Sequence, residues 1–475
     1  MDRKWRALLI VCIGIFMLLL DITVVNVALP SIRRELHTSF TDLQWVVDAY
    51  ALLLATCTLN AGTLGDWLGR KRVFIAGVVV FTLASALCGS ATTPLFLNLA
   101  RGLQGVGGAA MFSVSLAILS QEFRGRDRGT AFGIWGATIG LAVAIGPLVG
   151  GLLTEYAGWR WIFFVNLPIG VFCVFGALAY LHESRDEQHR GFDALGFVLL
   201  TGGLFALVLG LLRGNDWGWG SGKTIGLFVA AVVLLTAFVF SQLNKPEAMF
   251  DMALFKKPSF TGAQIIALTL SGGMFALFLY LTLYLQNQLH LSPLQAGLRF
   301  LPLSLISFVV APIAGRLSTR IPVRILFGVG MSLVGIALLS MHGITPSSTW
   351  TKLLPGFIIA GIGIGTVNAP LASTAVSVVE PRRAGMASGI NTTFRQVGIA
   401  TGVAGLGAIF QSKHSLIDGL NAILLVAAII SFAGAVLGFA LVREKDFVRP
   451  QQQADAAGSG SQAAKQQGSP SPRHP

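Results

Sequence analysis

Apolar runs long enough to cross a bilayer recur fourteen times along this chain of 475 residues. A helix of about 20 mainly apolar residues spans the hydrocarbon core of a membrane. Because such runs leave little chain for a water-soluble domain, the pattern predicts an all-α integral membrane protein with fourteen transmembrane helices. To within a few residues, the runs cover 7–29, 43–62, 73–91, 95–118, 129–153, 161–181, 194–212, 224–243, 260–286, 295–315, 322–341, 352–374, 385–410 and 420–442.

The composition points to the same class of protein. Charged residues make up 12 % of the chain and apolar residues 54 %, whereas a water-soluble domain carries about 25 % charge. The four cysteines lie inside apolar runs without paired spacing, and the seven histidines are scattered. The sequence therefore predicts no disulfide framework, no metal site and no cofactor.

The lysines and arginines between the runs indicate how the chain crosses the membrane. With the N-terminus inside, the inner segments hold 22 of the 34 basic residues and the outer segments hold 7. Cytoplasmic loops carry such an excess in membrane proteins. We therefore expect a multi-pass protein of the plasma membrane with both termini in the cytoplasm. The lipid bilayer, rather than nucleic acid, is the partner of its basic residues, and the chain is expected to work as a monomer.

The chain also repeats itself at an offset of 253 to 256 residues. Because the matching helices run in the same direction, the repeat is parallel, as in transporters built from two six-helix halves. The predicted organisation is a six-helix bundle over 1–182, a linker with two inserted helices over 183–258, a second six-helix bundle over 259–445 and a disordered tail over 446–475. The glycine matches are Gly62 with Gly315, Gly102 with Gly356, and Gly133 with Gly389.

Four charged residues lie deep inside the apolar runs, namely Asp21, Asp48, Arg101 and Arg395. A charge at the centre of a bilayer costs at least ~2.5 kcal/mol on insertion scales, so such residues usually pair or carry ions. At a rise of ~1.5 Å per residue, the first three fall in the outer half of the first repeat.

A carboxyl group balanced between a cation, which favours its charged form, and apolar surroundings, which favour its neutral form, can load and release a proton. We therefore name Asp21, Asp48 and Arg101 as candidate proton-coupling residues. A structural role remains open for each of them: Asp48 stands near a helix start, where it can act as a cap, and Arg101 can serve only as a pairing partner.

Two glycine-rich segments suggest moving parts. In the fifth run, Gly146 and Gly150 are four residues apart and allow close approach of another helix, while Pro147 bends the helix. We expect a gate hinge there, with plain tight packing as the alternative. In the loop that follows the second run, Gly62, Asp66 and Arg70 form a predicted conformational latch. Anchoring by positive charge on the inner side explains part of this loop.

Taken together, these motifs resemble the major facilitator superfamily, and in particular its fourteen-helix drug:proton antiporters. The segments similar to family motifs are GTLGDWLGRKR (62–72), its degenerate second copy GRLSTRIPVR (315–324), LARGLQGVGGAA (99–110), GPLVGG (146–151), LDITVVNVALPSI (20–32), WVVDAYALLLA (45–55) and GWRWIFFVNLPIG (158–170).

The resemblance implies a major facilitator fold that works by alternating access, with proton influx driving substrate export. It assigns Asp21 and Arg101 to proton coupling, Asp66 and Arg70 to a cytoplasmic latch, and the Gly146–Pro147 pair to an outer gate. Some exporters of dicationic compounds in this subfamily carry acidic residues in helix 13. Here that helix carries Arg395 and no acid, so we do not expect a preference for divalent cations.

By analogy with the family, helices 1, 4, 9 and 12 line the substrate cavity. Aromatic side chains there suit flat or cationic lipophilic ligands, although packing or lipid-facing roles remain open for them. The candidate cavity residues are Asn26, Gln104, Phe275, Phe278, Tyr280, Tyr284, Asn368 and Arg395.

The leading hypothesis is a drug:proton antiporter that exports lipophilic, cationic or amphipathic small molecules across the plasma membrane. The alternative is a transporter with a dedicated substrate, either a metabolite exporter or a solute symporter, and the glycine–proline motif of the fifth run favours export. A membrane-embedded enzyme or receptor would need a nucleophile, a metal cluster or a nucleotide loop. The sequence contains no such motif, so we expect neither catalytic residues nor a cofactor.

Overall fold

The computed structural model describes residues 2–38, 40–185, 193–243, 250–380, 383–413 and 415–447, and no strand occurs among them. The predicted tail therefore lies outside the described residues from position 448 onward. The helices are α1 (Arg3–Leu36), α2 (Phe40–Leu68), α3 (Arg70–Gly89), α4 (Pro94–Glu122), α5 (Gly125–Tyr156), α6 (Trp161–Phe164), α7 (Asn166–Tyr180), α8 (Ala194–Trp217), α9 (Gly222–Leu243), α10 (Pro258–Leu270), α11 (Ala276–Leu283), α12 (Pro293–Leu317), α13 (Val323–Met341), α14 (Leu354–Ser377), α15 (Ala384–Gln411) and α16 (Leu416–Leu441).

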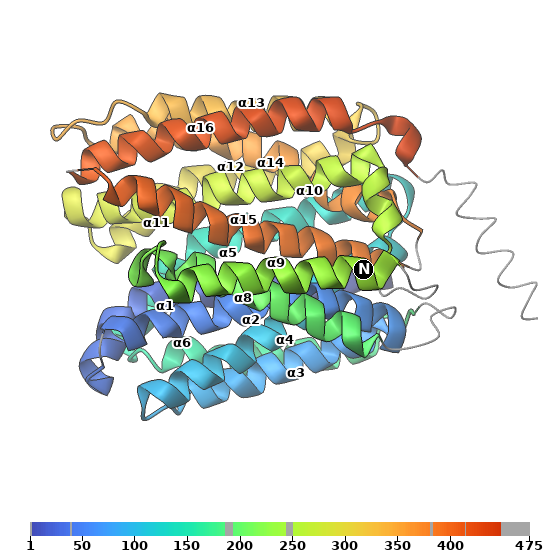
Figure 1. Cartoon of the computed structure of the whole chain (residues 1–475), viewed down its shortest axis with the longest axis horizontal. Coiled ribbons are helices and arrows are strands. Elements are labelled where there is room, and N and C mark those ends of the chain that lie inside the picture. Colours follow the sequence, from blue (N-terminus) through green and yellow to red (C-terminus); the bar gives the residue numbers. More distant parts are fainter. Residues whose placement is uncertain are drawn as a thin grey trace, which may run out of the picture.

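The long helices run side by side along the longest axis of the molecule (Figure 1). Most helices of the first half, coloured blue to cyan, lie in the lower part of the view, and most helices of the second half, coloured yellow to red, lie in the upper part. The green helices α8 and α9 lie in front, between the two sets. We call the end at which α1 begins the inner end and the opposite end the outer end.

Eleven of the described helices are long and apolar enough to cross a membrane. The other three predicted spans correspond to α5, to α15 and to the run from α10 to Gln288, and they are not among these eleven. The all-helical membrane architecture is therefore confirmed, while the count of fourteen spans stays a prediction.

The run over 260–286 differs from the continuous helix that the sequence predicted. The π-helical turn Ser271–Phe275 separates α10 from α11. A second π-helical turn, Tyr284–Gln288, follows α11. The first of these turns includes Gly272, whose missing side chain lets α15 approach: a Cβ there would lie 2.9 Å from the carbonyl oxygen of Gly398. Hydropathy alone carries no signal for such a turn, because the extra residue changes the hydrogen-bond register and not the apolarity.

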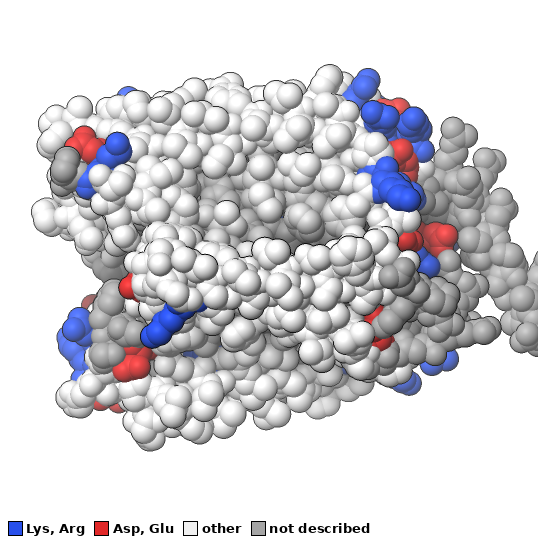
Figure 2. Space-filling view, viewed as in Figure 1, with Lys and Arg blue, Asp and Glu red and all other residues white. Residues whose placement is uncertain are grey.

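The surface has the polarity of a membrane protein. Charged side chains gather at the two ends of the long axis, and the face between them is almost entirely uncharged (Figure 2). Large apolar side chains are well exposed along the helices, among them Leu95 at 68 %, Val232 at 65 % and Val436 at 67 %. Such exposure is favourable in lipid and unfavourable in water.

Each half buries a large apolar cluster of its own. One draws mainly on α1, α3, α4, α5 and α7, and the other on the helices from α10 to α16. The inserted pair sits outside both clusters. In the most apolar stretch of α9 only 17 % of the residues are buried, against 83 % for α4, so α9 is the most peripheral of these spans. The helix α8 contacts α9 as well as α2 and α15, and therefore lies between α9 and the two halves.

Candidate functional site

Asp21 of α1 and Arg101 of α4 meet in the core of the first half. Arg101 Nη1 donates to Asp21 Oδ2 at 2.5 Å. Both residues are nearly inaccessible, at 2 % and 1 % exposure. The two residues therefore converge, as their estimated depths suggested, and they form an ion pair shielded from solvent.

Two amide side chains complete the hydrogen bonding of the Asp21 carboxylate. Gln104 Nε2 donates to Oδ1 at 3.0 Å and Asn166 Nδ2 donates to the same oxygen at 3.2 Å. Both amides also donate to Ser85 Oγ, which in turn donates to the carbonyl oxygen of Phe163. A buried charge is tolerated when its hydrogen-bonding capacity is filled in this way.

Sequence reasoning misassigned one member of this network and missed two. Gln104 was predicted to line the substrate cavity, but it is fully buried beside Asp21. Asn166 and Ser85 were not predicted at all. Asn166 was detectable, because it is the single amide in the apolar segment GWRWIFFVNLPIG, whereas a lone serine in an apolar helix gives no signal.

Arg101 also ties α4 to α2. Its Nε donates to the carbonyl oxygen of Val46 at 2.9 Å, and its guanidinium lies 4.3 Å from the ring centroid of Tyr50. The hydroxyl of Tyr50 donates to the carbonyl oxygen of Leu18 on α1. The charge on Arg101 therefore holds α1, α2 and α4 together, so a proton on Asp21 would weaken a contact among three helices.

Asp48 does not join this network, although the sequence places it in the same outer half of the first repeat. It lies on a different face of α2 from Val46 and Tyr50 and pairs with Arg213 of α8, whose Nε is 3.4 Å from Asp48 Oδ2. Arg213 was missed because it stands one residue beyond the predicted run 194–212 and was placed in an outer loop. The structure buries it at 1 % exposure.

The predicted latch is built at the inner end of α2. Asp66 Oδ1 accepts hydrogen bonds from Arg70 Nε at 2.8 Å and from Arg70 Nη2 at 2.6 Å. The same carboxylate accepts the backbone N–H groups of Gly385 at 2.9 Å and Met386 at 2.7 Å, in the first turn of α15. A carboxylate at a helix N-terminus is stabilised by the free N–H groups and the helix dipole. Asp66 therefore joins the first half to the second.

Glycines bring the backbones of α2 and α15 together beside this carboxylate. A Cβ on Gly62 would meet the carbonyl oxygen of Gly385, and a Cβ on Gly389 would lie 3.1 Å from Leu59. We call this contact, formed by Gly62, Gly385 and Gly389, the first inner contact.

The repeat produces a second such contact between α5 and α12. A Cβ on Gly129 would meet the carbonyl oxygen of Gly315, and the reverse holds for Gly315, while a Cβ on Gly133 would meet Pro312. At the offset of 253 residues, Gly315 corresponds to Gly62 and Thr319 to Asp66. We call the contact formed by Gly129, Gly133 and Gly315 the second inner contact.

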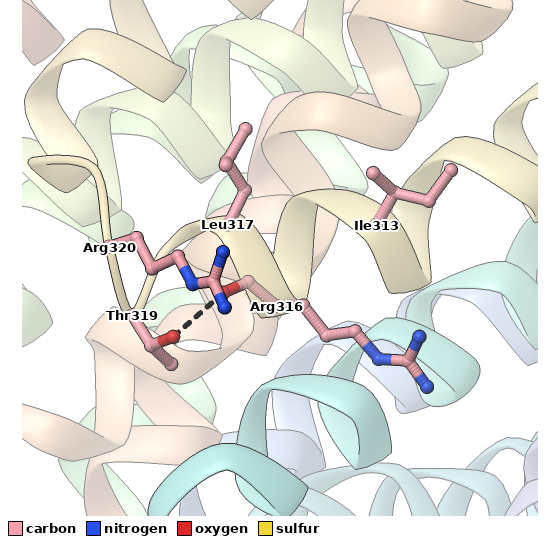
Figure 3. A pocket seen from close by; sticks show the side chains of 5 residues that line it. All are labelled: Ile313, Arg316, Leu317, Thr319 and Arg320. Carbon is pink, nitrogen blue, oxygen red and sulfur yellow. Dashed lines mark hydrogen bonds between the residues drawn. The ribbon is translucent and has the colours of Figure 1, made fainter.

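At the second inner contact, the position that corresponds to Asp66 is occupied by Thr319, which has no carboxylate to bond the opposite half. Its hydroxyl donates back to the carbonyl oxygen of Arg316, within its own turn (Figure 3). Arg316 Nε donates to Thr130 Oγ1 of α5 at 3.1 Å. Figure 3 shows Arg316 and Arg320 near the inner end of α12, with their guanidinium groups apart from each other. Together with Ile313, Leu317 and Thr319 they line a cavity of about 250 Å³.

The predicted gate hinge packs against the helix that carries Asp21. A Cβ on Gly146 would meet Thr23 Oγ1, and a Cβ on Gly150 would lie 3.0 Å from the carbonyl oxygen of Val24. These contacts on α1 lie within one helical turn of Asp21. The side chain of Pro147 lies outside the described part, and α5 runs through this position as one helix.

Three of the predicted cavity residues pack within the apolar cluster of the second half. Tyr280 and Tyr284 belong to the core of the second half. Tyr280 packs on Phe410 with ring centroids 4.8 Å apart, and Tyr284 donates to the carbonyl oxygen of Ser348. Phe278 packs on Phe300 at 5.1 Å. The aromatic character of this helix therefore serves packing, because each ring finds a partner within its own half.

Two further cavity predictions have simple outcomes. Asn26 is exposed, and its amide donates to the carbonyl oxygen of Ile22 in its own helix. The side chain of Phe275 lies outside the described part of the chain.

Asn368 is the predicted cavity residue that lies where the two halves meet, and Arg395 is bonded to it. Arg395 Nη2 donates to Asn368 Oδ1 at 2.9 Å, and the two are 5 % and 2 % exposed. Asn368 packs on α5 of the first half, where a Cβ on Gly136 would lie 3.5 Å from the Asn368 Cβ. Among the described residues, Arg395 has no acidic partner and its Nε has no hydrogen-bond acceptor.

Comparisons with known proteins agree with this architecture. A family model described as the Major Facilitator Superfamily matches residues 11–403. The Tetracenomycin C resistance and export protein of Streptomyces glaucescens is 34 % identical over 416 residues, which cover 86 % of this chain and 77 % of that protein. The Multidrug resistance protein Stp of Mycobacterium tuberculosis is 37 % identical over 403 residues, or 84 % of this chain and 74 % of that protein.

Among solved structures, that of the human organic anion transporter MFSD10 is similar with a TM-score of 0.68. It covers 92 % of this chain and 100 % of its own, at 15 % sequence identity. At that identity the likeness concerns the fold alone.

Proposed function

Because the chain belongs to the major facilitator superfamily, we propose that it is a proton-coupled exporter of lipophilic, drug-like compounds that works by alternating access. Members of this family are membrane transporters and not enzymes, and two relatives at 34 % and 37 % identity are named for drug or antibiotic resistance. The observation that carries the proton coupling is the buried ion pair between Asp21 and Arg101.

The proposed proton step acts through that ion pair. When Asp21 takes up a proton, its charge is lost and Arg101 keeps only the carbonyl of Val46 and the amide of Gln104 as acceptors. A buried cation without a counter-ion is unstable by several kcal/mol. The three helices that Arg101 joins therefore rearrange, and α1 moves against Gly146 and Gly150 of α5.

The inner contacts supply the other half of the cycle. In the structure both are closed, and Asp66 is bonded to the first turn of α15. We propose that proton uptake at Asp21 leads to opening of these contacts, and that proton release to the cytoplasm closes them. We also propose that the chain acts as a monomer in the plasma membrane with both termini and the inner contacts on the cytoplasmic side, which the distribution of Lys and Arg supports.

The proposed substrate is lipophilic, and the surroundings of Arg395 bear on its charge. The sequence favoured cationic compounds on the strength of aromatic residues, but those residues pack within the second half. Arg395, by contrast, is a buried cation bonded to Asn368, where the halves meet, and it has no acidic partner among the described residues. Because like charges repel strongly at low dielectric, we propose neutral or acidic lipophilic compounds as better substrates than cations.

A transporter with one dedicated substrate remains the second candidate. The relative from Streptomyces glaucescens is named for a single compound, whereas the relative from Mycobacterium tuberculosis is named for multidrug resistance. Resistance profiles against a panel of compounds, in a bacterial host without its own efflux pumps, separate the two. A narrow profile supports the dedicated transporter, and a broad profile supports the multidrug exporter.

Reconstitution into proteoliposomes tests proton coupling. The addition of a substrate identified in the resistance panel should drive proton movement across vesicles that contain the full chain, and Asp21→Asn should abolish it. Glu155→Gln is the matched control, because Glu155 is an exposed carboxylate at the outer end of α5. Substrate transport without proton movement in the unmodified protein would refute the proposal.

A further inference from the structure

We infer that Arg213 of the inserted helix α8 positions Asp48, so that the inserted pair α8–α9 is a working part of the coupling machinery and not a spacer between the halves. The inference rests on the proposed function and deepens it by adding Asp48 to the residues that exchange protons. It starts from a charge that hydropathy placed in a loop and the structure buries completely.

Arg213 is held by four side chains at the outer end of the molecule. Its Nη1 donates to Asp216 Oδ2 at 2.9 Å and to Gln44 Oε1 at 3.2 Å. Its guanidinium lies 4.4 Å from the ring centroid of Trp45 and its Nε lies 3.4 Å from Asp48 Oδ2. At 1 % exposure, this cation is stable only with such partners.

Gln44, Trp45 and Asp48 lie on one face of α2, as residues spaced by one, three and four positions do on a helix. Every contact that anchors Arg213 to the first half therefore comes from this face. Near the other end of α8, Thr201 accepts a hydrogen bond from Asn60 of α2 at 2.5 Å. These two attachments make α8 move with the first half.

The same helix also touches the second half. Asn215 Nδ2, two residues after Arg213, donates to the carbonyl oxygen of Ala404 on α15 at 3.3 Å. In alternating access α2 and α15 change their relative positions, so a helix attached to both has to release one of them. Apolar side chains of α8 also pack in clusters with residues of both α2 and α15. The charged and aromatic contacts of Arg213 to α2 are therefore what distinguishes the attachment of α8 to the first half.

Asp48 differs from Asp21 in its access to water. Its side chain is 19 % exposed, whereas that of Asp21 is 0 % exposed. The N–O distance of its ion pair with Arg213 is 3.4 Å, against 2.5 Å for Arg101 and Asp21. The two described hydrogen bonds that Arg213 donates go to Asp216 and Gln44. Asp48 is therefore held close to a cation without being locked to it, which suits a group that exchanges protons with the outer aqueous phase.

The charges that face Asp48 come from α8 alone among the described residues. They are Arg213 and Asp216, which act in opposite directions on the charge of Asp48. Arg101 of α4 reaches α2 on its other side, at Val46. The neighbouring α15 has a single described charge along its length, Arg395, and this residue is bonded to Asn368.

Difference infrared spectroscopy of the full-length protein in nanodiscs tests the inference without requiring transport. Subtraction of Asp48→Asn spectra isolates the carboxyl band of Asp48. Because a neighbouring cation favours the charged carboxylate, Arg213→Gln should move the pH midpoint of that band to a more alkaline value by about 1 unit. Arg213→Lys keeps the charge and should stay close to the unmodified protein.

Transport measurements complete the test. In proteoliposomes, Arg213→Gln should shift the external-pH profile of substrate export in the same direction, and it should have no further effect in the Asp48→Asn background. Lys223→Gln is the control, since Lys223 is an exposed cation at the outer end of α9. An unchanged Asp48 titration in Arg213→Gln overturns the inference. If the unmodified protein shows no substrate-driven proton movement, the proposed function is wrong. The infrared titration of Asp48 then still decides whether Arg213 positions Asp48.

Discussion

The two halves of this transporter share a backbone plan but differ in where they place charge. At the inner end, glycines bring α2 onto α15 and, by the same repeat, α5 onto α12. Within the described part of the chain, a carboxylate, Asp66, lies across the first contact alone, and its counterpart Thr319 bonds within its own turn. Deeper in the membrane, Arg101 of the first half corresponds to the exposed Pro355 of the second at the offset of 254 residues.

This difference suggests separate roles for the glycine contacts and for the buried charges. Backbone contacts between glycines are short-range and symmetric, so they determine how closely the halves can approach. The buried ion pairs Asp21–Arg101 and Asp66–Arg70 belong to the first half. Under the proposed function the first half would therefore contain the elements that respond to protons, while the second half contributes a complementary surface and Arg395.

The largest effect is expected at Arg101. Replacement by Met leaves Asp21 buried without its counter-ion, which destabilises a protein by about 3–5 kcal/mol. Pro355→Ala, at the corresponding position of the second half, should change stability by no more than about 0.5 kcal/mol because the residue is exposed. Thermal unfolding in detergent measures both. Equal effects at the two positions would show that the halves are alike in this respect.

Next in size is the effect of adding one methyl group at either inner contact. Gly62→Ala and Gly315→Ala each place a Cβ against the backbone of the opposite half, and overpacking of this kind costs about 1–3 kcal/mol. We expect both to hold the inner end open, with export reduced about tenfold or more. Labelling of a cysteine introduced beside each contact measures the opening. Gly151→Ala is the control, since a Cβ there meets nothing within 4 Å.

A smaller effect separates the two inner contacts. Asp66→Asn leaves the buried Arg70 without its counter-ion whether the inner end is open or closed. It also weakens charge-assisted hydrogen bonds to α15, which are worth about 1.5–3 kcal/mol and exist only when the inner end is closed, so it should favour the inward-open state. Thr319→Ala removes a hydroxyl that bonds only within its own turn and should leave the equilibrium within about twofold, a change below 0.5 kcal/mol. The same cysteine labelling compares them. A comparable shift in Thr319→Ala would remove the asymmetry between the contacts.

The smallest effect concerns substrate charge. Arg395→Gln removes the buried cation beside Asn368 but keeps a hydrogen-bond donor for Asn368. We expect the export ratio of an acidic compound to its neutral ester to fall several-fold, since one charge–charge contact is worth about 1 kcal/mol when partly screened. Competition assays in proteoliposomes measure this ratio. An unchanged ratio would assign Arg395 to packing alone.

Much of the fold was predictable from the sequence because lipid imposes simple rules. Run length, the excess of inner Lys and Arg and the glycine repeat all follow from the needs of helices in a bilayer. The sites of Asp21, Arg101, Asp66 and Arg70 were predictable for a related reason, since charges in apolar runs are costly and must have partners.

The identity of those partners was not predictable. Asp66 bonds backbone N–H groups of α15, which are present at every helix start and carry no sequence signal. Tyr280 and Tyr284 were predicted to line a cavity because aromatic residues suit ligands, yet they suit a helix core equally well. Arg213 was placed outside the membrane because it opens the polar segment 213–216, which ended the predicted run at residue 212, whereas α8 continues to Trp217.

The most direct test of the account is the pair Asp21→Asn and Asp21→Glu in proteoliposomes under an imposed proton gradient. Substrate-driven proton movement and substrate binding should be measured on the same preparation. We expect Asp21→Asn to bind substrate but move no protons, and Asp21→Glu to retain part of the movement. Proton movement at the unmodified rate in Asp21→Asn would contradict a proton-carrying role for Asp21.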